Sequence, residues 1–116
     1  MTIRYKNQGF KQSGTGKTTV FTCPSDGTAI VKSIYCANND ASSAILVNMN
    51  FVDSSDSSAE YEFFRDDVAA KEQVNAAPQG LNLEAGDAIT VQAATGSSKI
   101  QGLISYALID RSQENG

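Results

Sequence analysis

The chain has 116 residues, nine of them basic and 13 acidic, with a formal net charge of −4. This length leaves room for one domain, and the sequence contains no histidine and no tryptophan. Because histidine is the commonest general base and metal ligand at neutral pH, its lack argues against hydrolytic or zinc chemistry. We therefore expect no enzyme activity, no cofactor and no bound metal.

The first predicted unit is a basic arm at residues 1–17. Residues 1–25 carry four bases and no acid, whereas 26–116 carry five bases and thirteen acids. Such a split is typical of a terminal segment that contacts a negative partner. Four charges spread over the arm make a poor footprint for nucleic acid, so we predict an acidic protein surface as the target and no nucleic acid.

The arm is predicted to be extended, because Ile3 and Tyr5 alternate with Arg4 and Lys6. We expect it to dock on a neighbouring subunit, with the glycine-containing stretch at 13–17 as its hinge. The alternative is that the arm is an ordinary edge strand of its own body. The interface residues predicted on the arm are Ile3, Arg4, Tyr5, Lys6, Phe10 and Lys11.

The stretch SGTGKTT at 13–19 is similar to the end of a phosphate-binding loop. Counting back from its Gly-Lys-Thr places Lys11 where that loop requires its first glycine. The β-branched run that follows ends at Pro24, so it predicts a strand where the loop requires a helix. We interpret the stretch as a connector without nucleotide-binding function.

Residues 18–110 are predicted to form the body. Short runs rich in Val, Ile, Thr, Tyr and Phe alternate with clusters of turn residues, and no amphipathic helix lies between them. This pattern predicts an all-β fold, a single antiparallel β-sandwich or jelly roll with an N-terminal extended arm. The predicted strands are 18–23, 29–37, 43–52, 59–68, 88–95 and 99–109, and 111–116 is a polar tail.

Alternation of apolar and polar residues predicts which side chains form the core. The last strand is apolar on both sides, which leaves Leu103 and Ile109 for a partner and favours self-association. The alternative is that a second layer of the same chain covers these two residues. The predicted core includes Val20, Ile30, Ile34, Ile45, Val47, Met49, Phe51, Tyr61, Phe63, Ile89, Val91, Ile104 and Tyr106.

Other candidate sites are weaker. Asp53 and Asp56 lie in a serine-rich turn that lacks the central glycine and closing glutamate of a calcium loop, so we expect a solvated hairpin tip. Cys23 and Cys36 are too few for a disulfide framework and are predicted to be buried free thiols.

Three stretches of the body carry a family resemblance: VFTCPSDGTAIVKSIYCANND, LNLEAGDAITVQA and the ending SYALID. Over residues 18–110 they resemble small β-sandwich virion proteins of tailed bacteriophages, especially marine and cyanobacterial phages. The LEAGD turn is also similar to that of trimeric jelly rolls related to tumour necrosis factor. The resemblance implies an assembly protein used in threefold or ringlike arrays.

The leading hypothesis is thus a bacteriophage virion structural protein, a capsid decoration or cement protein that stabilises the head. Its partners would be the major capsid protein or other virion proteins. The alternatives are a neck, tail or fibre-attachment protein and, second, a carbohydrate- or receptor-binding module. No apolar run approaches the ~18 residues of a membrane span, and no signal peptide is evident. We therefore expect synthesis in the host cytoplasm, a place in the virion and no membrane partner.

Overall fold

The computed structural model describes residues 2–110, and the tail predicted at 111–116 lies outside them. Within this range the chain is nearly all β, and its one helical segment is a short 3₁₀ turn. No helix of the described residues is long and apolar enough to cross a membrane. The elements are β1 (Thr2–Gln12), β2 (Thr18–Thr22), β3 (Gly27–Asn38), β4 (Ile45–Asp53), η1 (Ser54–Asp56), β5 (Ala59–Val68), β6 (Gln73–Asn75), β7 (Asn82–Leu83), β8 (Ala88–Ala93) and β9 (Ile100–Asp110).

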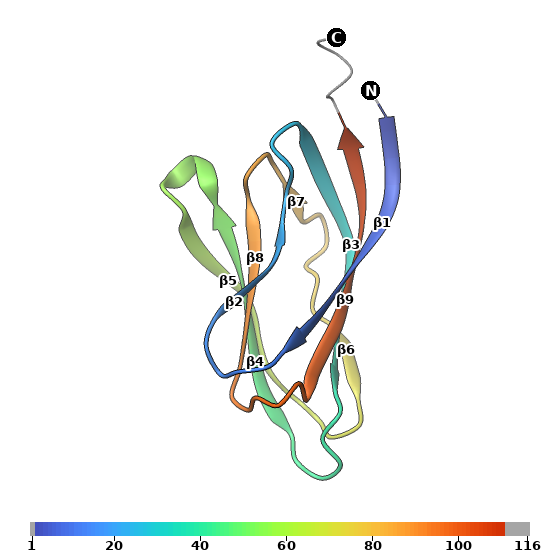
Figure 1. Ribbon diagram of the computed structural model, residues 1–116, viewed down its shortest axis with the longest axis vertical. Helices are drawn as coiled ribbons and strands as arrows, with labels where there is room; N and C mark the ends of the chain where they lie inside the picture. The colour runs from blue at the N-terminus through green and yellow to red at the C-terminus, as the bar shows by residue number, and fades with distance from the viewer. Residues whose placement is uncertain (1, 111–116) are drawn as a thin grey trace.

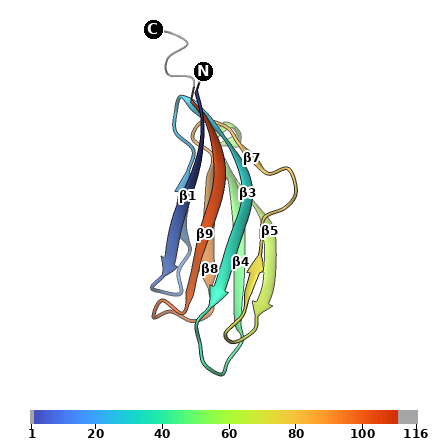
Figure 2. The same cartoon turned by 90° about the vertical axis from the view of Figure 1, so that its right-hand side faces the viewer.

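The described strands form two antiparallel sheets that pack face to face (Figures 1 and 2). Sheet 1 has the order β1-β9-β3-β6, and the two-residue β7 also pairs with β3. Sheet 2 has the order β2-β8-β4-β5. The chain repeatedly crosses between the sheets, and these two strand orders are those of a jelly roll. The predicted all-β sandwich is confirmed.

The predicted basic arm is part of this sandwich. β1 pairs with β9 over its full length, from Thr2 opposite Asp110 to Gln12 opposite Ile100. The boundary predicted at residue 17 therefore does not separate an arm from a body, and β1 is the edge strand of sheet 1. This agrees with the alternative reading of the arm, because its alternating residues find a partner strand within the same chain.

A β-bulge in β3 corrects one predicted core residue. The pairing of β3 with β9 shifts between Val31 and Ser33, so Lys32 is an extra residue in the ladder. The inward positions are therefore odd before the bulge and even after it. As a result Ile30 points outward and is 39% exposed, although Ile34 is fully buried as predicted.

The core between the sheets is formed by apolar side chains of both. Tyr61, predicted to be buried, is 52% exposed because β5 is the edge strand of sheet 2. Val20, Phe51 and Phe63 pack against the core but are only partly buried. The other predicted core residues are buried: Ile34, Ile45, Val47, Met49, Ile89, Val91, Ile104 and Tyr106.

Phe10 joins this core through a close approach of β1 and β9. It pairs in register with Gly102, whose inward position has no side chain. A Cβ at Gly102 would clash with the Phe10 ring and with the carbonyl oxygen of Tyr35. Gly102 therefore makes the space in which Phe10 lies, 8% exposed, against sheet 1.

Asp87 fastens the loops at one end of sheet 2. Its buried carboxylate accepts hydrogen bonds from the backbone N–H of Ser54 at 3.0 Å and from that of Glu84 at 2.8 Å. It also accepts one from the Ser54 hydroxyl at 2.9 Å. Gly86 takes the positive φ of 84° that this turn requires. The LEAGD stretch at 83–87 thus forms a turn that the side chain of Asp87 holds in place.

Candidate protein-interaction surface

The outward side of β1, β9 and β3 forms a continuous surface, which we call the sheet-1 face. The register of the three strands arranges its residues in rows across the sheet. From one end to the other, the rows are Ile3–Ile109–Thr28, Tyr5–Ala107–Ile30, Asn7–Ser105–Ser33, Gly9–Leu103–Tyr35 and Lys11–Gln101–Ala37.

Large apolar side chains gather on the sheet-1 face. Of the seven large hydrophobic residues that are exposed in the described chain, five lie here. Tyr5 is the most exposed, at 76%. The five are Ile3, Tyr5, Ile30, Tyr35 and Leu103. Single exposed apolar residues are common on proteins, but a group on one face makes that face the candidate interaction surface.

A polar row divides the sheet-1 face into two apolar patches. In this row the Ser105 hydroxyl donates a hydrogen bond of 2.7 Å to the Asn7 side-chain oxygen. The first patch has Tyr5 at its centre, and the second is formed by Tyr35 and Leu103, which pair across β3 and β9. Gly9 has no side chain beside Leu103, so that leucine stays open to solvent.

The second patch contains a shallow hollow of about 420 Å³. Tyr35 and Leu103 contribute large apolar side chains to its lining, and three other residues contribute amide side chains. The lining residues are Tyr35, Ala37, Asn39, Gln73, Gln101, Gly102 and Leu103. Such a hollow fits one protruding apolar side chain of a partner, with amide groups around it to pair polar atoms.

The charges on the sheet-1 face are basic. Lys11 lies in its last row, and the Lys32 ammonium lies 4.9 Å from the centre of the Tyr5 ring. At that distance the cation interacts with the face of the ring. The five rows contain no acidic residue. The surface therefore complements an apolar patch with an acidic rim.

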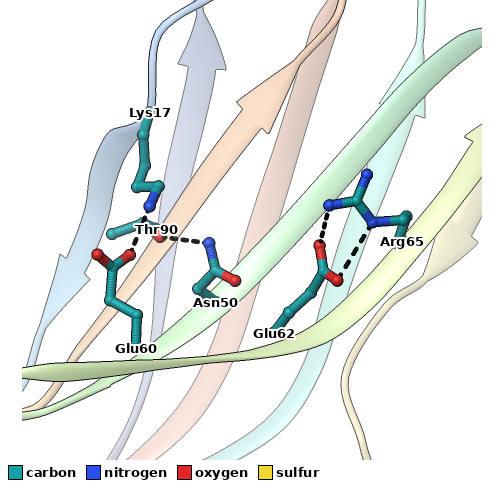
Figure 3. A network of polar contacts seen from close by, with 6 residues as sticks. All are labelled: Lys17, Asn50, Glu60, Glu62, Arg65 and Thr90. Carbon is teal, nitrogen blue, oxygen red and sulfur yellow. Dashed lines mark hydrogen bonds and ion pairs between the residues drawn. The ribbon is translucent and has the colours of Figure 1, made fainter.

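The outward side of sheet 2, which we call the sheet-2 face, is polar instead (Figure 3). Lys17 forms an ion pair with Glu60 at 2.8 Å, beside the hydrogen bond of 3.4 Å from the Asn50 amide to the Thr90 hydroxyl. Asn50 and Thr90 point outward and yet are buried, 7% and 5% exposed. Side chains of this sheet satisfy one another and leave little that calls for a partner.

The structure brings together part of the predicted interface. Ile3, Tyr5, Lys11, Leu103 and Ile109 all lie on the sheet-1 face. No second layer of the described chain covers Leu103, which is 40% exposed. These residues belong to β1 and β9, which are far apart in the sequence and form one surface because the two strands pair.

Three other predicted interface residues lie elsewhere. Phe10 is corrected to a core residue, because its even position in β1 points between the sheets. Arg4 and Lys6 share that inward side but remain exposed, since β1 extends along the open edge of the sandwich. Arg4 lies 3.9 Å from Asp110 of β9.

Sequence reasoning missed Ile30, Lys32 and Tyr35 as members of the surface. Tyr35 could be found from its position between Ile34 and Cys36, which face inward. Ile30 and Lys32 could not, because the bulge in β3 leaves no signal in the alternation.

Possible metal ligands and the two cysteines are the other candidates for a site. Nowhere in residues 2–110 do three or more side chains of His, Cys, Asp or Glu gather as metal ligands. Cys23 and Cys36 are free and buried, and burial raises the pKa of the Cys36 thiol from 9.0 to about 11. Burial also raises the pKa of Cys23. Both thiols are therefore poor nucleophiles at neutral pH.

Comparisons with known proteins place the fold but no family. No protein-family model matches the chain, and no curated protein matches it by sequence. Among solved structures it is similar to a Bacillus endospore appendage, described as a novel family of disulfide-linked pili, with a TM-score of 0.51 and 12% identity. That match covers 92% of this chain and 86% of the appendage chain.

A second similar structure comes from the T13 viral particle of infectious bursal disease virus. It has a TM-score of 0.54 and 8% identity, and covers 94% of this chain. This chain spans only 31% of that viral chain. At such identities the two likenesses show a shared β-sandwich fold.

Proposed function

We propose that this chain is a virion structural protein, a capsid decoration or cement protein of a tailed bacteriophage that docks on the head through its sheet-1 face. The observation that carries the proposal is the concentration of five large exposed apolar side chains on that one face. A folded β-sandwich has no need of them there, and a bound partner would remove them from water.

The chemistry of the face defines the partner. Two apolar patches with Lys11 and Lys32 beside them fit a capsid surface that offers apolar anchors within an acidic rim. The partner would be the major capsid protein or another virion protein, and the chain would be made in the host cytoplasm before it joins the particle. We infer a homo-oligomer, with a trimer favoured by the resemblance to phage virion proteins and trimeric jelly rolls.

The comparisons support a role in an assembly. One similar structure belongs to a viral particle and the other to a pilus, and both descriptions concern built structures. The pilus is described as disulfide-linked. In this chain Cys23 is 1% exposed and Cys36 is fully buried, so folded subunits would need contacts other than disulfides.

The test is binding of the purified protein to particles that lack it. We expect it to cosediment with heads at a copy number that scales with that of the major capsid protein. A copy number of a single ring would instead assign it to the neck or tail. Lack of binding to any part of the particle would contradict the proposal.

A matched pair of variants identifies the docking face. Leu103→Ser removes an apolar anchor of the sheet-1 face, and Leu46→Ser removes a leucine of similar exposure, 37%, on the sheet-2 face. We expect particle binding to weaken about tenfold or more in Leu103→Ser alone, as for loss of a central anchor. Equal weakening in both variants would contradict docking through the sheet-1 face.

The hollow in the second patch favours one other function, binding of a saccharide. Tyr35 offers a ring for stacking, and Asn39, Gln73 and Gln101 offer amide groups for hydroxyls. A single aromatic ring is a small platform, so we rank this function second. Binding on a glycan array that is lost in Tyr35→Ala and kept in Leu46→Ser would support it.

A further inference from the structure

Each sheet ends in one long strand with an unpaired edge. Among residues 2–110, β1 pairs only with β9, and β5 pairs only with β4. The two strands have similar lengths, 11 and 10 residues. They lie on opposite sides of the sandwich in both views (Figures 1 and 2). An unpaired edge exposes a row of backbone donors and acceptors that another strand can bind.

The two edges carry opposite charges. β1 contains Arg4, Lys6 and Lys11 and no acid, which gives three positive charges. β5 contains four acids and one base, Arg65, which gives a net charge of −3. Pairing of β1 with β1, or of β5 with β5, would place like charges together, which destabilises a sheet. Pairing of β1 with β5 places opposite charges together.

The directions of the strands allow this pairing between copies. Figure 2 shows the arrows of β1 and β5 running the same way. A neighbour related by rotation about an axis along the strands, or by translation across them, keeps that direction. Its β5 then runs parallel to β1, and parallel strands pair with evenly spaced hydrogen bonds.

One register aligns the complementary residues. With Arg4 beside Glu60, Tyr5 falls beside Tyr61 and Lys6 beside Glu62. Tyr5 and Tyr61 are the two most exposed aromatic residues of the described chain, at 76% and 52%. An Arg-Tyr-Lys segment thus lies beside a Glu-Tyr-Glu segment. The aromatic pair stands between two pairs of opposite charges, one before it and one after it along the strands.

The faces of the strands also agree. Tyr5 points to the outward side of sheet 1, and Tyr61, in register with Phe51, belongs to the inward side of sheet 2. When neighbours stand side by side, the outward side of sheet 1 is continuous with the inward side of the next sheet 2. The two tyrosines then lie on one side of the joined sheet, and the charged residues lie on the other.

The contacts that β5 already makes within its own chain do not oppose this. Glu60 pairs with Lys17 at 2.8 Å, and Glu62 pairs with Arg65 at 2.8 Å. All of these side chains are substantially exposed, and exposed ion pairs contribute little to stability, so the carboxylates are available for a second cation.

We propose that the subunits associate with one another head to tail, with β1 of one copy adding to the β5 edge of the next in the Tyr5–Tyr61 register. This deepens the proposed function, on which it rests, by naming the contact between subunits. Such a heterologous contact produces a ring or a filament, and a trimer is the smallest ring it can close. The partner is a second copy of this chain.

Disulfide trapping tests the register. Tyr5→Cys/Tyr61→Cys in one chain should give covalent species larger than a dimer under mild oxidation. We expect crosslinking at least about tenfold faster than in the off-register control Tyr5→Cys/Asp67→Cys, because a held pair has a high effective concentration. The native thiols Cys23 and Cys36 are buried and give no background.

The single variants and a second pair complete this test. Tyr5→Cys alone and Tyr61→Cys alone should not crosslink beyond a trace. Efficient dimers from either single variant would show pairing of like edges and overturn the proposal, as would no trapping in the double variant. Ile3→Cys/Ala59→Cys should crosslink, while Ile3→Cys/Phe63→Cys, which reports an antiparallel pairing, should not.

Charge exchange tests the chemistry independently. In sedimentation at low salt, Arg4→Glu/Lys6→Glu and Glu60→Lys/Glu62→Lys should each lose association, and the chain that carries all four changes should regain it. Lys71→Glu/Lys99→Glu has the same charge change as the first variant and should associate like the wild type. Circular dichroism confirms that each variant is folded. The proposal would be overturned if the folded variant with all four changes did not regain association. It would also be overturned if the wild type stayed monomeric.

Association of subunits through β1 and β5 can be distinguished from docking on a particle. Leu103→Ser leaves both edges intact. When it is added to Tyr5→Cys/Tyr61→Cys, disulfide crosslinking should be as efficient as without it, although Leu103→Ser weakens binding to particles. Trapping without particle binding by the wild type would contradict the proposed function alone. Particle binding without trapping would contradict the pairing of the edges alone.

Discussion

The two sheets bury similar apolar side chains between them, but their outward sides differ. The sheet-2 face is covered by polar residues that bond to each other, such as Asn50 with Thr90 and Lys17 with Glu60. The sheet-1 face exposes Tyr5, Tyr35 and other large apolar residues to solvent. Folding constrains the inward positions of both sheets, so the difference between their outward positions is what supports the proposed docking through sheet 1.

The largest effect we expect comes from removing the support beneath the sheet-1 face. In Gly102→Ala the new methyl group would overlap the Phe10 ring and the Tyr35 carbonyl oxygen, so β1 must shift away from β9. We expect a loss of about 3 kcal/mol in the free energy of unfolding, measured with denaturant. Gly14→Ala is the control, because a Cβ added at Gly14 would have no atom within 4 Å of it. Equal stability of the two variants would show that Phe10 is not held there.

A smaller effect should come at high pH from Cys36, which lies on the inward side of sheet 1. The folded state raises the pKa of Cys36 to about 11, above its ordinary 9.0. The unfolded chain therefore loses this proton first, so the contribution is complete below pH 9 and is lost as pH rises through 11. We expect a fall of about 2–3 kcal/mol by pH 11. Cys36→Ala, measured over the same range, should lack that share of the fall. Identical pH profiles would contradict this assignment.

The smallest effect on stability should come from making the sheet-2 face more apolar, as the sheet-1 face is. Asn50→Leu/Thr90→Val replaces both partners of a hydrogen bond by apolar groups of similar shape, so stability should change by about 1 kcal/mol or less. The change should instead add an apolar patch and promote association or dye binding. Asn50→Leu alone is the contrast, because it leaves the Thr90 hydroxyl without this partner. A double variant that binds no more dye than the wild type would weaken the comparison of the faces.

Most of the fold could be predicted from the sequence, because long strands carry a strong alternation. Ile45, Val47 and Met49 are buried as their spacing requires. β6 and β7 were missed, since strands of three and two residues exist only through their pairing with β3. Ile30 was placed on the wrong side because a bulge at Lys32 changes the phase of β3 without any mark in the local sequence.

The candidate site was partly predictable for the same reasons. Leu103 and Ile109 were assigned to a contact surface because they oppose an apolar inward side, and the structure exposes Leu103 there. Phe10 was assigned wrongly, although its even position separates it from Ile3 and Tyr5. The glycine at 102 within an apolar strand was the available signal, because such a glycine marks a close approach by a neighbour. The grouping of β1 with β3 depends on β9 lying between them, which no local pattern reveals.

The pairing of β1 with β9 means that β1 has no strand partner until β9 has been synthesised. β1 leaves the ribosome before β9, which is its only strand partner in the described chain. The 88 residues from Gln12 to Ile100 take roughly 4–18 s to translate at about 5–20 residues per second. Throughout that time both edges of β1 are open in a crowded cell. Its three basic side chains, with no acid among them, repel the waiting β1 strands of identical nascent chains.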